Sequence, residues 1–247
     1  MKLKFTYNKN SFLNSKTSLF LAAVFCLMTG LLSSCAKATS GSVTTTATSV
    51  FAVINASPNC PSSDFYINNV MVNATAFTYN NYLGYFNGPV GLSKFGLYDE
   101  GTLTAIATDT LTLKANQAYS VFFTNLIATP TFVVFRDTIY APAASSASIR
   151  LVNVSPDAPN VDLAIGGAVF ATNITYKQAS KFVAIPVASN DTLMIRQTGT
   201  TNVLAKVSAV TIQLGAVYTI WLDGFATPPA TGDALNAGLM ENAAFTN

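Results

Sequence analysis

The sequence predicts an all-β fold made of two tandem antiparallel β-sandwiches. Val, Ile, Thr, Phe and Tyr are frequent after residue 48, and Gly, Pro and Asn interrupt them at short intervals; these are typical strand and turn residues. Apolar segments recur every ten to fifteen residues, as the strands of sandwich domains do. The pattern restarts after about a hundred residues, the length of one immunoglobulin-like or transthyretin-like sandwich.

The chain begins with a segment that is typical of a signal peptide, expected at residues 1–34. Residues 1–18 carry four Lys and no acid, and the fourteen residues 19–32 carry no charge. Fourteen residues make a helix of about 21 Å, short of the roughly 30 Å core of a membrane. Residues 32–35 read LSSC, which resembles the bacterial lipobox. This resemblance implies that Cys35 is lipidated and anchors the protein to a membrane; the alternative is a secretory signal that Cys35 follows by coincidence.

Residues 35–48 are rich in Ser and Thr and predict a flexible tether. Without residues 1–34, nine Lys/Arg remain against eleven Asp/Glu, so the whole-chain charge of +2 becomes −2. The remaining cations are scattered singly along the chain. This distribution argues against nucleic acid as a partner.

Cysteine and histidine content limits the chemistry of the chain. Only Cys60 remains beyond Cys26 and Cys35, so no intramolecular disulfide is expected. Cys60 aligns with Ala158 of the second repeat, which favours a small structural residue over a reactive thiol. The chain contains no His, which excludes histidine triads and His-ligated zinc. We therefore expect a protein that is not an enzyme and that holds no cofactor or metal.

The first repeat is expected at residues 49–143 and the second at residues 144–247, with a boundary near 141–147. In the first repeat the pattern predicts strands at residues 49–55, 64–68, 90–99, 102–113, 118–126 and 131–138. In the second repeat it predicts strands at residues 148–154, 161–167, 181–187, 192–198, 202–214 and 217–225, with a short edge strand at 237–242.

The two halves share a ten-residue motif, N-x-S-P-x-x-P-x-x-D. It reads NASPNCPSSD at residues 55–64 and NVSPDAPNVD at residues 153–162, 98 positions later. Further matches, such as LTLKANQAYSV (111–121) with VTIQLGAVYTI (210–220), keep nearly the same offset. These residues resemble the bacterial domain of unknown function 4397, closely over 147–225 and more loosely over 49–126. The resemblance implies a β-sandwich protein of the Bacteroidota cell envelope with no established activity.

The motif has two interpretations. As a turn, its prolines fix the backbone, Ser155 and Asp157 accept hydrogen bonds from backbone N–H groups one or two residues on, and Asp162 closes the loop or faces solvent. As a cation site, Asn153, Asp157 and Asp162 supply three oxygen-bearing side chains. Calcium usually takes more than two carboxylates, and the first copy has Asn59 in place of Asp157. The turn is therefore favoured.

An aromatic stretch, TYNNYLGYFNG at residues 78–88, is a candidate glycan contact. Ring faces stack on sugars and amide side chains bond to hydroxyl groups. The second repeat keeps Tyr176 and Phe182 but has no counterpart of Tyr82 and Tyr85, which makes these two the candidates. The alternative is that alternate rings fill the core.

Asp-Thr-apolar triplets occur at residues 109–111, 137–139 and 191–193. They resemble the O-glycosylation acceptor sequence of Bacteroidota envelope proteins, which implies Thr110, Thr138 and Thr192 as attachment sites. A plain turn-to-strand junction explains the same triplets equally well.

Two function classes follow from these observations, and a third is considered beside them. The first is a non-enzymatic, lipid-anchored outer-membrane protein that serves as a structural, adhesion or assembly module with envelope proteins as partners, on the periplasmic or the surface side. The second is a surface lipoprotein that binds glycans. The third is a hydrolase that uses Asp99 and Glu100, but neighbouring strand residues point to opposite faces and do not converge on one substrate.

Overall fold

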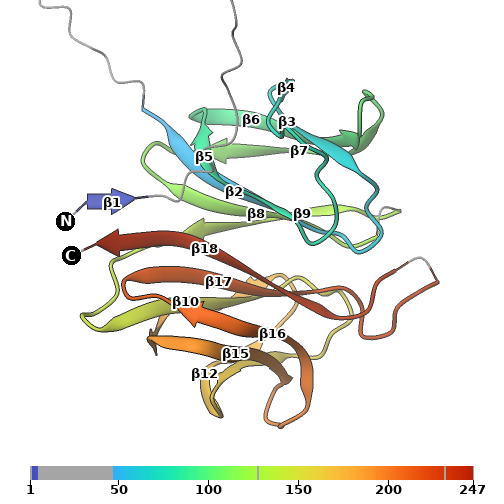
Figure 1. The fold of residues 1–247 in the computed structure, drawn as a ribbon. Coiled ribbons are helices and arrows are strands. Elements are labelled where there is room, and N and C mark those ends of the chain that lie inside the picture. The colour runs from blue at the N-terminus through green and yellow to red at the C-terminus, as the bar shows by residue number, and fades with distance from the viewer. Residues whose placement is uncertain (1, 5–46, 127, 231, 247) are drawn as a thin grey trace, which may run out of the picture. The chain divides into compact units, whose positions relative to one another are not determined.

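The computed structural model describes residues 2–4, 47–126, 128–230 and 232–246. Cys26, Cys35 and most of the expected signal peptide and tether lie outside these residues. The described chain forms β-strands without a helix, so no helix in this part has the length and apolarity of a membrane span. The all-β fold with two sandwich domains is confirmed (Figure 1).

The first repeat contains two four-stranded sheets, in the orders β5-β2-β8-β9 and β4-β3-β6-β7. Its strands are β2 (Ser49–Ala56), β3 (Ser63–Ile67), β4 (Val70–Met71), β5 (Tyr82–Gly88), β6 (Gly91–Asp99), β7 (Ala105–Leu113), β8 (Ala118–Thr124) and β9 (Thr131–Asp137).

The second repeat follows the same plan, with a sheet in the order β18-β17-β10-β13, in which β14 also pairs with β10, and a sheet in the order β12-β11-β15-β16. Its strands are β10 (Ser146–Asn153), β11 (Val161–Ile165), β12 (Ala168–Ile174), β13 (Gln178–Ala179), β14 (Val183–Pro186), β15 (Ala188–Gln197), β16 (Val203–Ile212), β17 (Ala216–Asp223) and β18 (Asn236–Thr246).

A further strand, β1 (Lys2–Lys4), pairs with the end of β18. It lies within the expected signal peptide, so cleavage before Cys35 would remove it and leave β18 at the edge of its sheet. β18 itself is eleven residues long, almost twice the length of the edge strand expected at 237–242.

Each repeat contains one parallel strand pair in an otherwise antiparallel sandwich. β2 runs parallel to β8, and β10 runs parallel to β17. A parallel pair needs a long crossover between its strands, and here the crossover is the rest of the sandwich. The strand that precedes the motif in each repeat, β2 or β10, therefore lies beside the strand that ends the matched segment, β8 or β17.

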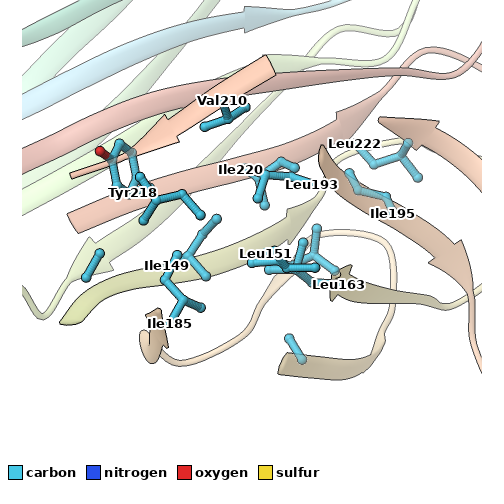
Figure 2. Packing of buried hydrophobic residues seen from close by; sticks show 14 of the residues in the cluster. Ile149, Leu151, Leu163, Ile185, Leu193, Ile195, Val210, Tyr218, Ile220 and Leu222 are labelled. Atoms are coloured by element: carbon cyan, nitrogen blue, oxygen red, sulfur yellow. The ribbon is translucent and has the colours of Figure 1, made fainter. Parts of the chain in front are cut away.

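Each sandwich has its own apolar core between its two sheets. The first core contains Phe51, Val53, Phe65, Ile67, Phe77, Phe95, Leu97, Leu113, Tyr119, Val121 and Phe123. The core of the second repeat, shown in Figure 2, includes Ile149, Leu151, Leu163, Ile185, Leu193, Ile195, Val210, Tyr218, Ile220 and Leu222. Burial of one such side chain contributes about 1.5–3 kcal/mol.

Tight turns explain two strands that the sequence pattern did not predict. Asn68 and Asn69 both have positive φ between β3 and β4, as Gly166 and Gly167 do between β11 and β12. Two consecutive residues with positive φ form the type I′ turn that matches the twist of a hairpin. The chain therefore folds straight back into β4 and β12.

Candidate functional site

A third apolar cluster lies where the two repeats pack against each other, and we call it the inter-repeat layer. It joins the β5-β2-β8-β9 sheet to the β18-β17-β10 sheet, and its buried residues are Ala52, Ile54, Ala56, Tyr85, Phe122, Val133, Val152, Val154, Trp221 and Met240. Trp221 packs edge-to-face on Phe122 with ring centroids 5.9 Å apart. β2 and β17 are consequently buried on both faces.

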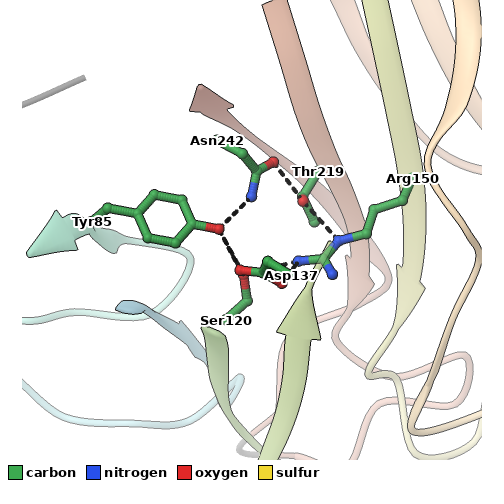
Figure 3. Close-up of polar contacts among 6 residues, drawn as sticks. All are labelled: Tyr85, Ser120, Asp137, Arg150, Thr219 and Asn242. Atoms are coloured by element: carbon green, nitrogen blue, oxygen red, sulfur yellow. Dashed lines mark hydrogen bonds and ion pairs between the residues drawn. The ribbon is translucent and has the colours of Figure 1, made fainter. Parts of the chain in front are cut away.

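Six polar side chains from six strands meet inside this layer and form the polar cluster (Figure 3). Arg150 and Asp137 are the charged pair: Nη2 lies 2.6 Å from Oδ1, and the side chains are only 3% and 0% exposed. The carboxylate also accepts hydrogen bonds from the hydroxyl groups of Tyr85 and Ser120. The charges are thus paired and hydrogen-bonded, as burial requires.

The polar cluster closes into a ring of hydrogen bonds. Arg150 Nε donates to Thr219 Oγ1 at 2.9 Å, and Thr219 donates to Asn242 Oδ1 at 2.7 Å. Asn242 Nδ2 then donates to Tyr85 Oη at 2.8 Å, which leads back to Asp137. Burial and the neighbouring carboxylate raise the pKa of Tyr85. Its hydroxyl therefore remains a proton donor, and the ring ties the repeats together.

A second buried carboxylate, Asp223 at the end of β17, also links the repeats. Tyr79 Oη of the first repeat and Trp221 Nε1 of the second both donate to it, each at 2.9 Å. Burial raises the pKa of Asp223 to about 7, although these donors act in the opposite direction. This carboxyl therefore changes its charge near neutral pH.

The shared motif is a structural turn in both copies. Asn55 Oδ1 accepts from the Ser57 N–H and its Nδ2 donates to Phe77 O. Asn153 repeats this pattern with Ser155 and Ile174. Each Asn side chain thus gives a hydrogen-bond partner to the N–H group of the Ser two residues on and to a carbonyl group of another segment.

The predicted partners of Ser155 and Asp157 were wrong, because the partners of both residues are distant in the sequence and Ser155 donates a hydrogen bond where it was expected to accept one. Ser155 Oγ donates to Gly224 O at 2.7 Å, and Asp157 accepts from the N–H groups of Ala226 and Thr227 at 2.8 and 2.9 Å. The motif therefore fastens the loop after β17 instead of closing on itself.

Asp162 follows neither branch of the prediction, because it is buried and its partners lie in β12 and in the turn after β15, outside the motif loop. It accepts from Asn173 N and Thr198 Oγ1 at 2.8 Å and from Gly199 N at 3.0 Å. Although burial alone would raise its pKa, these hydrogen bonds outweigh burial and lower it. The oxygens proposed as cation ligands thus face backbone and hydroxyl donors, and the described residues contain no group of three metal-ligating side chains.

The two glycan candidates differ in where the structure places them. Tyr85 is 5% exposed, and its hydroxyl belongs to the polar cluster, so its prediction as a surface contact was wrong. Tyr82 is 41% exposed and packs edge-to-face against Trp221. A register shift in the β2–β5 pair places both rings on the inter-repeat face of β5, with Tyr85 inside the layer and Tyr82 at its exposed margin. The sequence pattern did not predict β5, which explains the error.

The three O-glycosylation candidates lie in different surroundings. Thr110 and Thr138 are exposed, whereas Thr192 is half-buried. Asp109 and Asp191 accept a hydrogen bond from the N–H of the Thr that follows. Asp137 instead belongs to the polar cluster. The first and third triplets lie within strands β7 and β15, not at a turn-to-strand junction. The second serves the inter-repeat contact through Asp137.

Two further candidates from the sequence are Cys60 and the acid pair Asp99 and Glu100. Cys60 is half-buried against the first core, and burial raises the pKa of its thiol, which disfavours the reactive thiolate. Asp99 ends β6 and Glu100 begins the next turn.

The comparisons with solved structures give only distant likenesses. A family 26 carbohydrate-binding module of Eubacterium rectale Amy13K, in complex with maltoheptaose, aligns with a TM-score of 0.26 and 12% identity over 74% of this chain and 100% of that one. The product complex of the multi-modular glycogen-degrading pneumococcal virulence factor SpuA gives 0.26 and 8% over 76% and 21%. Alpha-glucan-recognising family 41 carbohydrate-binding modules from streptococcal virulence factors give 0.25 and 9% over 76% and 96%. Likenesses this weak carry no argument about function.

No curated protein matches this chain. Residues 49–164 and 147–242 each match the family described as "Domain of unknown function (DUF4397)". The two matches overlap at residues 147–164, which contain most of β10 and β11 of the second repeat. Because they span more than half of the sequence, the protein belongs to the DUF4397 family and carries the domain twice.

Proposed function

We propose that this protein is a non-enzymatic, lipid-anchored module of the cell envelope in which two sandwiches form one rigid unit for structural or assembly contacts. The observation that carries the proposal is the inter-repeat layer with its polar cluster. It buries Trp221, Phe122 and the Arg150–Asp137 pair between the repeats. Domains linked in this way keep a fixed mutual orientation, unlike domains on a flexible linker.

The use of the buried acids supports a structural role. Asp137, Asp162 and Asp223 each accept hydrogen bonds from groups that close loops or join the repeats. The LSSC sequence that ends at Cys35 supports an anchor in the outer membrane. Lipidation would place both repeats beyond the Ser/Thr-rich tether, free to meet envelope proteins.

The anchor is tested by partition of the full chain between detergent and water after expression in a bacterial host. The wild-type protein is expected in the detergent phase, and Cys35→Ala is expected in the aqueous phase. Cys60→Ala is the matched control, because the second repeat has Ala158 at that position; it should remain with the detergent. Cys35→Ala protein that stays in the detergent phase contradicts lipidation.

The side of the membrane is tested by protease treatment of intact cells, with mass spectrometry of the released peptides. Peptides from both repeats would favour adhesion at the surface. Full protection would favour a periplasmic assembly role, and crosslinking would then identify the envelope partners.

Glycan capture is a second candidate function, favoured by Tyr82. Its ring is 41% exposed and fixed in orientation by Trp221, and a fixed ring can stack on a sugar face. A glycan array should show binding that Tyr82→Phe retains and Tyr82→Ala loses. Equal binding by the two variants would exclude this ring as the contact.

A further inference from the structure

A groove of about 680 Å³ lies beside the polar cluster, between the end of β9, the segment that follows it, β10, β13 and the connection from β13 to β14. We call it the cationic groove. Its lining includes Arg136, Tyr140, Arg150, Ser180, Lys181 and Phe182. Both repeats contribute, so the groove depends on their packing.

The lining carries an excess of positive charge. Arg136, Arg150 and Lys181 contribute cations, and the lining contains no Asp or Glu. Three of the nine Lys/Arg that follow residue 34 thus meet in one groove, although that part of the chain has a net charge of −2. The fold gathers cations that are scattered along the sequence.

Two of these cations are available to a ligand. Arg150 is paired with Asp137. Arg136 and Lys181 are exposed, and among the described residues neither forms an ion pair. An anion that entered the groove would therefore meet positive charge that the protein itself does not neutralise.

The groove also offers flat apolar faces next to these charges. Tyr140 is 75% exposed. The Phe182 ring stacks on the Arg150 guanidinium, with Cζ 4.7 Å from the ring centroid, which stiffens one wall. Ser180 Oγ donates to Lys181 O and accepts from Leu151 N, so the start of the β13–β14 connection is fixed. Aromatic faces beside hydroxyl groups suit the C–H face and hydroxyls of a sugar ring.

We propose that the cationic groove binds an acidic saccharide, with a sugar carboxylate between Arg136 and Lys181 and the sugar ring against Tyr140. This proposal rests on the second candidate function in naming a glycan, but it uses a different site from Tyr82. A carboxylate suits paired cations because charge-assisted hydrogen bonds are roughly twice as strong as neutral ones. A neutral saccharide would leave both cations unpaired.

The test is calorimetric titration of the full chain in detergent with trigalacturonate, maltotriose and inorganic phosphate. Trigalacturonate should bind, and the binding should weaken at least about tenfold between about 0.05 and 0.5 M salt, because exposed charges are screened over that range. Maltotriose and phosphate should bind far more weakly. The proposal is overturned by either of two results: phosphate binds as tightly as trigalacturonate, or maltotriose does.

The variants locate the site. Arg136→Gln combined with Lys181→Gln should weaken trigalacturonate binding about tenfold or more, and Tyr140→Ala should weaken it while Tyr140→Phe retains it. Lys206→Gln, an exposed cation on β16, is the matched control and should have no effect. If trigalacturonate does not bind, or if Lys206→Gln weakens its binding as much as the Arg136→Gln and Lys181→Gln double variant does, the proposed site is contradicted. Neither result changes the Cys35 partition or the Tyr82 array, so failure here is distinct from failure of the proposed function.

Discussion

At the scale of single residues, the Arg150–Asp137 pair is the most consequential contact between the repeats. Both side chains are almost fully buried, and removal of one partner leaves an uncompensated charge, which typically costs about 3–5 kcal/mol. We expect Arg150→Met to lower the free energy of unfolding by that order in urea denaturation. Arg150→Met combined with Asp137→Leu should cost less than either single change.

Arg136→Met is the control for this experiment, because Arg136 is the exposed neighbour of Asp137. Its effect should stay within about 0.5 kcal/mol, as for most surface changes. An Arg150→Met protein as stable as the wild type would show that the pair does not join the repeats.

The stability of the protein should depend on the ionisation of Asp223. Its folded pKa of about 7 exceeds the unfolded value of about 3.9, so the folded state binds a proton that the unfolded state releases. Stability is then greatest at acidic pH and falls as pH rises through about 7, by up to about 3 kcal/mol between about pH 5 and 8. The chain has no His to obscure this slope.

The measurement is urea denaturation across that pH range, with Asp223→Asn as the comparison. The variant should show a much flatter pH profile. A wild-type profile that rises with pH, or a slope that Asp223→Asn retains, would contradict the assignment.

The residue roles predicted from the sequence were accurate where they were local. The motif is a turn in both copies, whereas Asp162 is bonded to residues of β12 and of the turn after β15. The partners of Ser155 and Asp157 lie about seventy residues away, and a single sequence contains no direct signal for such pairs. The burial of Tyr85 likewise depends on Asn242, 157 positions later.

At the scale of elements, the repeated motif and the periodic apolar segments predicted most of the strands in both halves. β4 and β12 were missed, although Asn68-Asn69 and Gly166-Gly167 are the residue pairs that hairpin turns favour. β5 was read as a surface stretch because its aromatic residues sit among Asn and Gly. In that strand, an irregularity in the pairing with β2 turns Tyr85 into the layer, on the same face as Tyr82.

Gly238 in β18 shows how one element is shaped by another. A Cβ atom at this position would lie 2.0 Å from Cζ2 of Trp221, so Gly238→Ala must displace the indole. We expect a loss of about 1–3 kcal/mol in thermal or urea unfolding, the usual effect of overpacking.

Trp221→Phe should relieve this clash, because a phenyl ring is smaller than an indole. Phe is chosen because the equivalent residue of the first repeat is Phe122. The double variant should therefore lose less stability than the sum of the two single losses. Strictly additive losses of stability would show that Gly238 is not needed to accommodate the Trp221 indole.

At the scale of the whole molecule, equivalent positions of the two repeats have diverged where the repeats meet. Ala52 corresponds to Arg150, Phe122 to Trp221 and Thr124 to Asp223. At these three positions the second repeat carries the larger or charged side chain, and its partners Asp137, Tyr79 and Tyr85 come from other positions of the first repeat. The sequence suggested two independent sandwiches; the substitutions at these positions were the available signal that their faces pack together.

The central claim, that the two repeats form one cooperative unit, is tested most directly by hydrogen exchange with mass spectrometry on the full chain. Leu97→Ala removes a buried contact of the first core, which typically costs about 2–5 kcal/mol. The account predicts faster exchange in β15 and β16 of the second repeat as well as in β6 of the first, with Ile195→Ala producing the reciprocal result. Unchanged exchange in β15 and β16 of Leu97→Ala would show that the repeats unfold separately and would contradict the account.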